Sequence, residues 1–309
     1  MNRSDLSSID RVAEALRGQR YIADRALATA VYLAISLDKP IFLEGEAGVG
    51  KTELAKVLAE ILGTELIRLQ CYEGLDTHTA LYEWDYPRQM LEVRLQEARG
   101  VEKKNIGADI FSEEFLLKRP LLRAIQAEGP TAPVLLIDEV DRSDEEFEAF
   151  LLEILSDFQI TVPEIGTLKA RQIPTVVLTS NRTRELHDAL KRRCLYHWID
   201  YPDVDKEAEI VRARVAGIDT ILAAQLAHFM GRIRAEDLYK RPGIAETIDW
   251  AQALLALGAT GLDAETIDAT LGCILKYKGD MDRLRASDLS KLADEARQAE
   301  AFAAAPMTR

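Results

Sequence analysis

Short apolar runs and helically spaced apolar residues alternate along the first part of the chain. Five runs are typical of strands: 40–44, 65–70, 134–139, 175–179 and 196–201. Apolar residues at every third or fourth position predict helices over 10–17, 24–37, 54–62, 87–100, 121–127 and 147–155. A capping box from Ser143 to Glu146 is expected to start the last of these helices. Such alternation predicts an α/β fold with a parallel sheet covered on both faces.

The strand signals stop near Pro202, where we place a domain boundary. An α/β domain is therefore expected over 1–202 and a helical domain over 203–309, with a short Ala-rich tail over 296–309. Helices of the second domain are predicted over 206–215, 221–233, 244–257, 266–277 and 287–300.

Two segments of the first domain depart from the alternation. Residues 72–126 have a loose pattern and are interpreted as an insertion, whose aromatic residues either form a small core, which we favour, or face a partner. Gly166 separates two β-prone runs, so residues 157–170 are predicted to form a hairpin.

The most specific signal lies between the first strand and the helix after it. Residues 45–52 read GEAGVGKT, the spacing of a phosphate-binding loop, in which glycines let backbone N–H groups converge on phosphate oxygens. Lys51 is expected to reach the β- and γ-phosphate oxygens, and the Thr52 hydroxyl to bind Mg²⁺. The predicted ATP-binding residues are Gly45, Glu46, Ala47, Gly48, Val49, Gly50, Lys51, Thr52 and Glu53.

Polar side chains follow two further apolar runs. Asp138 and Glu139 end the run at 134–139, and ligands bind beyond the carboxyl ends of strands in α/β sheets. Asp138 is therefore expected to hold the Mg²⁺ shell and Glu139 to activate the attacking water. Asn181 ends the run VVLTSN, where we expect it to orient the water or contact the γ-phosphate, with an Asx turn as the alternative.

Two arginines, Arg192 and Arg193, stand in the segment ALKRRC. Planar guanidinium groups suit the charge of a phosphoryl transition state. Arginines at the end of a short helix are equally typical of a surface that complements the helix dipole, so position alone leaves both readings open.

The bulk properties exclude some classes of protein. A net charge of −13 over 309 residues argues against nucleic-acid binding, which needs clustered Lys and Arg. The chain has no apolar run long enough for an integral membrane segment, and its start lacks the apolar core of a signal peptide, so a cytoplasmic location is expected. Its three cysteines lack metal-ligand spacing and fit a reducing compartment.

These motifs together resemble a known family over roughly residues 21–298. GEAGVGKT, VLLIDEVD, VVLTSN, the arginines of ALKRRC and the trailing helices resemble the AAA+ ATPases, and among them the MoxR family. Three segments resemble the CoxD type, which is associated with maturation of carbon monoxide dehydrogenase beside a von Willebrand factor A protein. They are LEGEAGVGKTELAKVLAEILG, LLIDEVDR and the stretch from SNRTRELHDALKRRCLYHWIDYP to KRPGIAETIDWAQAL. The resemblance implies a five-stranded parallel sheet between helices, a C-terminal helical lid and a homo-oligomeric ring, expected to be a hexamer.

The resemblance also implies residue roles. Walker A is carried by residues 45–52, Walker B by Asp138 with Glu139 as the base, and sensor 1 by Asn181. The arginine finger, which acts on the ATP of a neighbouring subunit, matches Arg193 best and Arg192 second. The hairpin at 157–170 resembles the pre-sensor hairpin, and the family packs its adenine at the positions of Tyr21 and Ile22.

One position departs from the family pattern. Many relatives place a sensor 2 arginine directly after the proline of the lid, but here Gly243 follows Pro242 and Arg241 precedes it. Either Arg241 serves in a shifted geometry or the lid reports on nucleotide more weakly.

The leading hypothesis is an ATPase whose ring remodels a client, a metalloenzyme or its partner. The alternatives are a nucleotide-gated binding module and a DNA-handling AAA+ ATPase, and the acidic charge counts against the second. A small-molecule kinase would leave the arginine pair and Asn181 without a purpose.

Overall fold

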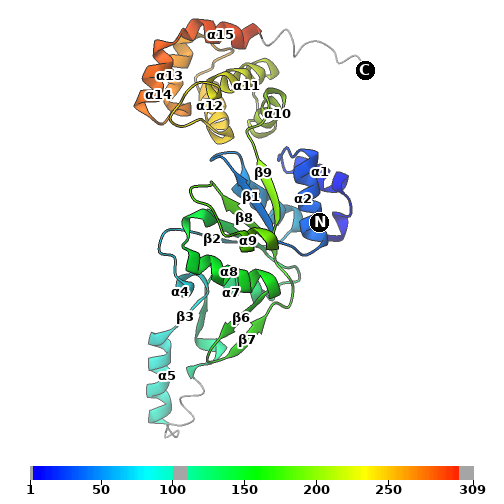
Figure 1. The fold of residues 1–309 in the computed structure, drawn as a ribbon, viewed down its shortest axis with the longest axis vertical. Coiled ribbons are helices and arrows are strands. Elements are labelled where there is room, and N and C mark those ends of the chain that lie inside the picture. Colours follow the sequence, from blue (N-terminus) through cyan, green and yellow to red (C-terminus); the bar gives the residue numbers. More distant parts are fainter. Residues whose placement is uncertain (1–2, 100–109, 299–309) are drawn as a thin grey trace. The chain divides into compact units, whose positions relative to one another are not determined.

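The computed structural model describes residues 3–99 and 110–298, so part of the predicted insertion (100–109) and of the tail (299–309) lies outside the described residues (Figure 1). Up to the last strand the elements are η1 (Arg3–Asp5), α1 (Ile9–Gly18), α2 (Arg25–Ser36), β1 (Ile41–Gly45), α3 (Lys51–Leu62), β2 (Leu66–Gln70), α4 (Thr77–Ala80), β3 (Tyr82–Trp84), α5 (Tyr86–Ala98), η2 (Glu113–Phe115), β4 (Leu116–Lys118), α7 (Pro120–Ile125), β5 (Val134–Asp138), η3 (Val140–Arg142), α8 (Glu145–Asp157), β6 (Gln159–Val162), β7 (Gly166–Lys169), β8 (Thr175–Ser180), α9 (Asp188–Arg193) and β9 (Leu195–Ile199). The elements that follow are α10 (Val204–Arg214), α11 (Thr220–Arg234), α12 (Ile244–Ala256), α13 (Ala264–Ile274), α14 (Lys278–Ala286) and α15 (Leu289–Gln298).

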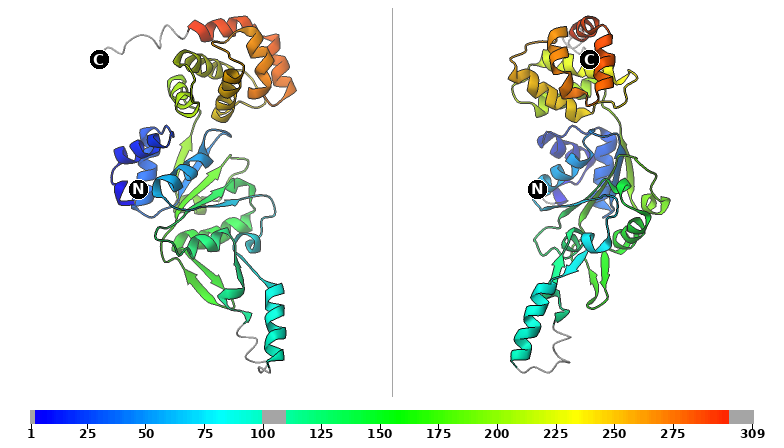
Figure 2. Two further views of the ribbon diagram at one scale, coloured as in Figure 1. Left: turned by 180° about the vertical axis from the view of Figure 1, so that it is seen from behind. Right: turned by 90° about the vertical axis from the view of Figure 1, so that its left-hand side faces the viewer.

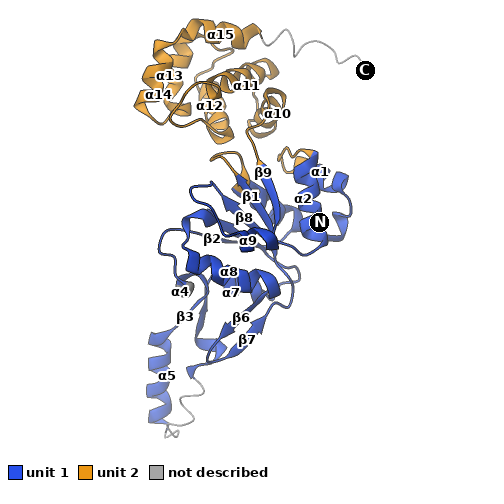
Figure 3. Cartoon of the chain, in the orientation of Figure 1, with its two compact units in different colours: residues 1–15, 25–44, 52–198 blue, residues 16–24, 45–51, 199–309 orange. Residues whose placement is uncertain are grey.

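The chain forms two compact units (Figure 3). The first unit comprises residues 1–15, 25–44 and 52–198, and the second comprises 16–24, 45–51 and 199–309. The helical unit therefore includes two short segments from the amino-terminal part, one of which is most of the phosphate loop. No helix of the described residues is long and apolar enough to cross a membrane.

A five-stranded sheet organises the first unit, in the order β2-β5-β8-β1-β9. The pairs β2·β5, β5·β8 and β1·β8 are parallel. The fold is thus the expected parallel sheet flanked by helices, followed by a helical region. Every residue of β1, β5 and β8 is buried, which explains their unbroken apolar runs.

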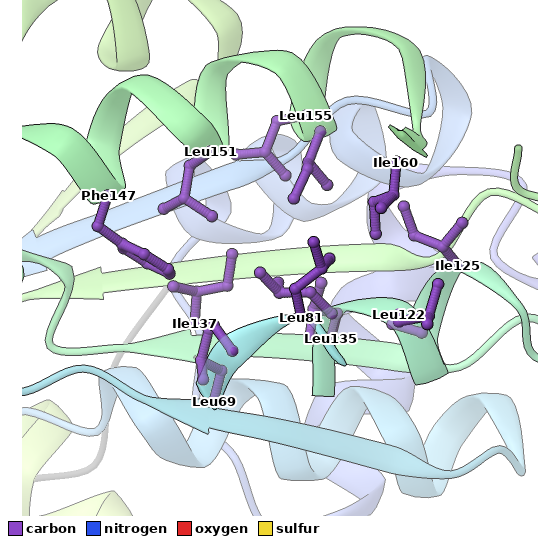
Figure 4. Close-up of a cluster of buried hydrophobic side chains, with 14 of the residues drawn as sticks. Leu69, Leu81, Leu122, Ile125, Leu135, Ile137, Phe147, Leu151, Leu155 and Ile160 are labelled. Carbon is purple, nitrogen blue, oxygen red and sulfur yellow. The ribbon is translucent and has the colours of Figure 1, made fainter. Parts of the chain in front are cut away.

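One face of the sheet packs on helices α7 and α8 (Figure 4). Side chains alternate across a strand, so the residues of β2, β5 and β8 that face these helices are every second one. They are Ile67, Leu69, Leu135, Ile137, Val176 and Leu178. Helix α8 contributes Phe147, Leu151, Ile154 and Leu155, the helical spacing seen in the sequence. In Figure 2, α2 and α3 lie on the opposite face.

The start of α8 differs in detail from the prediction. Asp144, not Ser143, caps the helix, because its carboxylate accepts a hydrogen bond from the Phe147 N–H at 2.8 Å. Ser143 instead donates its hydroxyl to the Val140 carbonyl.

The insertion contains an antiparallel pair, β3 with β4, that the sequence pattern did not reveal. Trp84 and Phe115 are buried, but they pack into the main core of the first unit and do not form the small separate core that we favoured. Tyr86 is 65% exposed at the start of α5, which leads away from the strands in both views of Figure 2. The predicted hairpin is present, with β6 and β7 antiparallel.

The second unit has its own core around Trp250 and Phe229, whose rings lie 5.1 Å apart. The buried Trp250 indole N–H donates to the Thr270 hydroxyl at 2.8 Å, which satisfies its polar atom. Five of its helices were expected, but α14 was not. Gly279 was taken as a break, whereas it lies in the first turn of α14, where a glycine is tolerated at modest cost.

Candidate nucleotide-binding site

The phosphate loop, residues 45–51, belongs to the second unit. Gly48 and Gly50 have φ angles of 77° and 94°, which side-chain-bearing residues rarely adopt. The Lys51 ammonium is buried and donates to the carbonyls of Gly45 and Glu46 at 2.8 and 2.6 Å. The lysine side chain therefore folds back onto the loop and lies beside the backbone that would surround a bound phosphate.

A glycine is required at position 45 because the backbone of Ile199 passes very close to it. A Cβ at this position would lie 2.1 Å from the Ile199 carbonyl oxygen, a distance that no side chain can accept. The first glycine of the motif is thus required where the strand β1 enters the loop.

Tyr21 contacts the loop from the segment 16–24. Its hydroxyl donates to the Gly50 carbonyl at 3.3 Å, and the ring stands next to Gly50. Ile22 is half-buried beside it in the sequence. Contact with the loop is compatible with the expected place of these two residues near the base of the nucleotide, which stays a prediction.

Gly243 gives a steric reason for the departure at sensor 2. A Cβ here would lie 2.7 Å from the Ala47 carbonyl oxygen and 2.8 Å from the Gly48 Cα. The Ala245 N–H also donates to the Gly48 carbonyl at 3.2 Å, so the first turn of α12 lies directly on the phosphate loop. An arginine at position 243 has no room in this arrangement, while Arg241 is exposed.

We expect Gly243→Ala to weaken ATP binding about tenfold, because overpacking by one methyl costs about 1 to 3 kcal/mol and the loop must shift to accept it. Gly279→Ala is the matched control, since a Cβ there meets no atom within 4 Å. Fluorescent-nucleotide titration measures both affinities. Equal affinity in wild type and Gly243→Ala would show that α12 does not set the shape of the loop.

Asp138 and Thr52 come together in the first unit. The Thr52 hydroxyl donates to Asp138 Oδ1 at 2.9 Å, and the Thr179 hydroxyl donates to the same oxygen at 2.6 Å. A hydroxyl and a carboxylate oxygen are the hard donors that Mg²⁺ takes, usually with phosphate oxygens and water completing the shell. Among the described residues, no group of three His, Cys, Asp or Glu could hold a metal ion unaided. The donor set therefore fits a magnesium ion that arrives with nucleotide.

Glu139 adopts a strained backbone, with φ 54° and ψ 51° in the left-handed region that is uncommon for glutamate. Its N–H donates to the Thr179 hydroxyl at 2.9 Å, which holds this conformation. Its carboxylate accepts hydrogen bonds from the side-chain amides of Gln70 and Asn181, both at 3.1 Å. The Arg142 Nε lies 3.4 Å from Glu139 Oε2. Strain of this kind gathers at functional sites.

Asn181 meets Glu139 directly, as a polar residue at the end of β8 should. The Asn181 backbone N–H donates a hydrogen bond to the carboxylate of Asp141, a buried residue. The same carboxylate also accepts hydrogen bonds from the backbone N–H and the hydroxyl of Thr183. Asp141 thus anchors the loop after β8, and with it the amide that contacts Glu139. The hydrogen bonds of Asn181 go to Glu139 and Asp141, which is not the self-contained Asx turn of the alternative.

Four residues that contact the carboxylates were missed by the sequence reasoning: Arg68, Gln70, Arg142 and Thr179. Arg68 and Gln70 lie on β2, which pairs with β5 in register Gln70↔Asp138. Only the order of strands in the sheet reveals this neighbourhood. Thr179 stands within VVLTSN, two positions before Asn181, so its place at a strand end was a usable signal.

Cys71 lies beside the carboxylates but is chemically quiet. Burial, followed by the charges of Asp138, Asp141 and Glu139, raises the pKa of its thiol to about 12. The thiol therefore stays protonated at neutral pH and is excluded as a nucleophile.

The two candidate finger residues end α9 and are both exposed. The Arg193 guanidinium donates to the Ser156 hydroxyl and, at 3.2 Å, to the Ala189 carbonyl. Within residues 3–99 and 110–298, Arg192 makes no hydrogen bond or ion pair. Neither arginine contacts Asp138 or Glu139 of its own chain. An arginine that acts on the nucleotide of a neighbouring subunit does not need such a contact.

Comparison with known proteins gives three kinds of similarity. Two uncharacterised proteins of Staphylococcus aureus, from strains bovine RF122 / ET3-1 and NCTC 8325 / PS 47, are each 28% identical over 228 residues, which cover 72% of this chain and 77% of theirs. Among solved structures, a mutant of Thermotoga maritima RuvB is 20% identical with a TM-score of 0.46, covering 86% of this chain and 71% of that one. The Thermotoga maritima RuvB Holliday junction branch migration motor is 19% identical with a TM-score of 0.44 over the same shares. The profile of the AAA domain, dynein-related subfamily, matches residues 40–194, from the first strand to the arginine pair.

That match spans half of the chain and contains the loop, both carboxylates and Asn181, so the chain belongs to the AAA domain family of the dynein-related subfamily.

Proposed function

We propose that the protein is a MoxR-type AAA+ ATPase that hydrolyses ATP at the subunit interfaces of a ring. One observation carries the proposal: Thr52, Asp138, Glu139 and Asn181 are joined through Thr179 in one hydrogen-bonded group. Members of the family generally bind ATP with Mg²⁺, hydrolyse it and assemble into rings. The exposed arginines of α9 support a site completed by a second subunit, and a hexamer is the ring we expect.

The chemistry follows from these side chains. Water attacks the γ-phosphorus in line, the bond to the bridging oxygen breaks, and Glu139 takes the proton of the water. Asn181 and Gln70 keep the Glu139 carboxylate at the end of β5. Lys51 and an arginine from the neighbour neutralise the charge that develops on the transferred group. Mg²⁺, when bound by Thr52 and Asp138 with ATP, supplies further charge neutralisation.

We further propose a client: a molybdenum-containing metalloenzyme similar to carbon monoxide dehydrogenase, handled together with a von Willebrand factor A protein in the cytoplasm. The CoxD-like motifs support this choice, and three free thiols suit a reducing compartment. Hydrolysis would move the lid, and the β6–β7 hairpin, whose β7 residues are mostly exposed, would contact the client.

Phosphate release by the purified protein tests the activity. We expect Mg²⁺-dependent hydrolysis whose rate per subunit rises steeply with protein concentration, because each site needs a neighbour. Sedimentation with ATP on the same samples should show the ring. A rate per subunit that is independent of concentration, in a protein that sediments as a monomer, would contradict the proposal.

The client is tested separately by deleting this chain in its host. We expect the metalloenzyme to accumulate without its metal centre, and metal content to return with wild type but not with Glu139→Gln. Full metal content in the deletion strain would exclude this client while leaving the ATPase proposal intact.

A further inference from the structure

Arg68 occupies an unusual place next to the carboxylate that would hold Mg²⁺. Its Nη2 donates to Asp138 Oδ2 at 2.5 Å and to Gln70 Oε1 at 2.5 Å. The Asp138 side chain is only 3% exposed, whereas the Arg68 side chain is 50% exposed. A nearly buried carboxylate is thus neutralised by a cation that reaches it from the solvent side.

The strand register explains how Arg68 reaches this carboxylate. Strands β2 and β5 are parallel, with Arg68 opposite Leu136 and Gln70 opposite Asp138. Side chains of even-numbered residues on both strands therefore project from one face, while Ile67 and Leu69 pack into the core on the other. Arg68 and Gln70 lie next to each other on this face, and both meet the carboxylates at the end of β5.

The contacts of Asp138 divide between its two oxygens. Oδ1 receives the hydroxyls of Thr52 and Thr179, and Oδ2 receives Arg68. A magnesium ion beside the Thr52 hydroxyl would place a double positive charge close to the guanidinium. Like charges held close together repel each other, and solvent screens this repulsion less where a group is nearly buried, so the ion and the guanidinium compete for the charge of Asp138.

Arg68 is also linked to the proposed base. The Gln70 side-chain oxygen accepts a hydrogen bond from Arg68. The nitrogen of the same amide donates a hydrogen bond to Glu139 Oε2 at 3.1 Å. Arg68, Gln70 and Glu139 therefore form a continuous chain of hydrogen bonds.

We propose that Arg68 is a resident counter-ion of Asp138 that competes with Mg²⁺ and is displaced when the metal binds. This inference rests on the proposed function, because it presumes that Thr52 and Asp138 hold the magnesium of ATP. Arg68 is a positioning residue, because it acts through its charge on Asp138.

The test compares Arg68→Met with Arg68→Lys and with a matched control. Arg68→Met removes the charge and keeps the length of the side chain, and Arg68→Lys keeps the charge. Arg123→Met is the control, because Arg123 pairs with Glu65 beside β2 and is 48% exposed, nearly the same as Arg68. Mn²⁺ binding in the presence of ADP, followed by electron paramagnetic resonance, measures metal affinity without turnover, and fluorescent ADP in EDTA measures nucleotide affinity without metal.

We expect Arg68→Met to bind Mn²⁺ about tenfold more tightly than wild type, since a competing charge is removed. Arg68→Lys and Arg123→Met should stay within about twofold of wild type, and ADP affinity in EDTA should be unchanged in all of them. Equal or weaker Mn²⁺ binding by Arg68→Met would overturn the proposal, as would weaker ADP binding in EDTA, which would mean that Arg68 contacts nucleotide. If wild type binds no nucleotide at all, the proposed function itself fails.

A thermal-unfolding measurement separates the proposal from a purely structural ion pair. We expect Arg68→Met to lower Tm without metal and to regain most of this loss with Mg²⁺ and ADP, because the metal then supplies the missing charge. The same loss of Tm with and without metal would show that Arg68 only stabilises the fold.

Discussion

Glu139→Gln is expected to lower the rate of ATP hydrolysis by at least about 10² to 10⁴ while leaving ATP affinity nearly unchanged. The amide has the size of the carboxylate but cannot take a proton from water. Asn181 and Gln70 donate to Glu139 through their own amides, and an amide oxygen at position 139 can still accept one of these hydrogen bonds. The strained backbone is held by the N–H contact to Thr179, which the substitution leaves in place. The change should therefore remove chemistry without removing the fold.

Single-turnover phosphate release and nucleotide titration on the same preparation measure this prediction. Glu153→Gln is the matched control, because it makes the same change at an exposed position of α8. Wild-type turnover in Glu139→Gln would show that another group activates the water.

Removal of the arginine finger should have a comparable or larger effect. A guanidinium supplied from outside a phosphoryl-transfer site is worth roughly 10³ to 10⁵ in rate. We expect Arg193→Ala to show this loss in the assembled protein, with ATP affinity little changed. Arg193 must first leave Ser156 and the Ala189 carbonyl, weak contacts of an exposed side chain that a neighbouring phosphate can replace.

Arg192→Ala and Lys191→Ala complete this series, since each removes one positive charge from the same turn of α9. Both should retain activity within a few-fold of wild type. If Arg192→Ala carries the loss instead, the finger is Arg192, and Arg193 serves to tie α9 to α8. If none of the three slows hydrolysis, α9 does not complete a site.

The sequence allowed much of the fold to be predicted because the fold depends on local patterns. Strands β1, β5 and β8 are buried on both faces, so their apolar runs stand out, and the glycines and lysine of the loop follow from phosphate chemistry. The helix α14 was missed because Gly279 was read as a stop, although the packing of Leu284 and the buried Asp280 hold the helix in place. Tertiary packing there outweighs a local preference.

The rest of the site depends on which distant segments become neighbours. Nothing in the residues around Arg68 shows that β2 lies beside β5, because β3, α5, β4 and α7 intervene in the chain. The steric role of Gly243 is hidden for the same reason, since it exists only where α12 meets the phosphate loop. The motifs identified the residues that would carry the chemistry. The residues that hold them in position could not be predicted, because they become neighbours only in the folded chain.

The central claim is that each active site needs residues from two subunits, and one mixing experiment tests it most directly. Glu139→Gln lacks the base but keeps both arginines, and a variant with Arg192→Ala and Arg193→Ala lacks the finger but keeps Glu139. Each should be nearly inactive alone. Mixed in equal amounts and assembled, they should recover hydrolysis well above either variant, because an intact Glu139 then meets an arginine from its neighbour. If mixed rings form and no activity returns, the account of a shared site is contradicted.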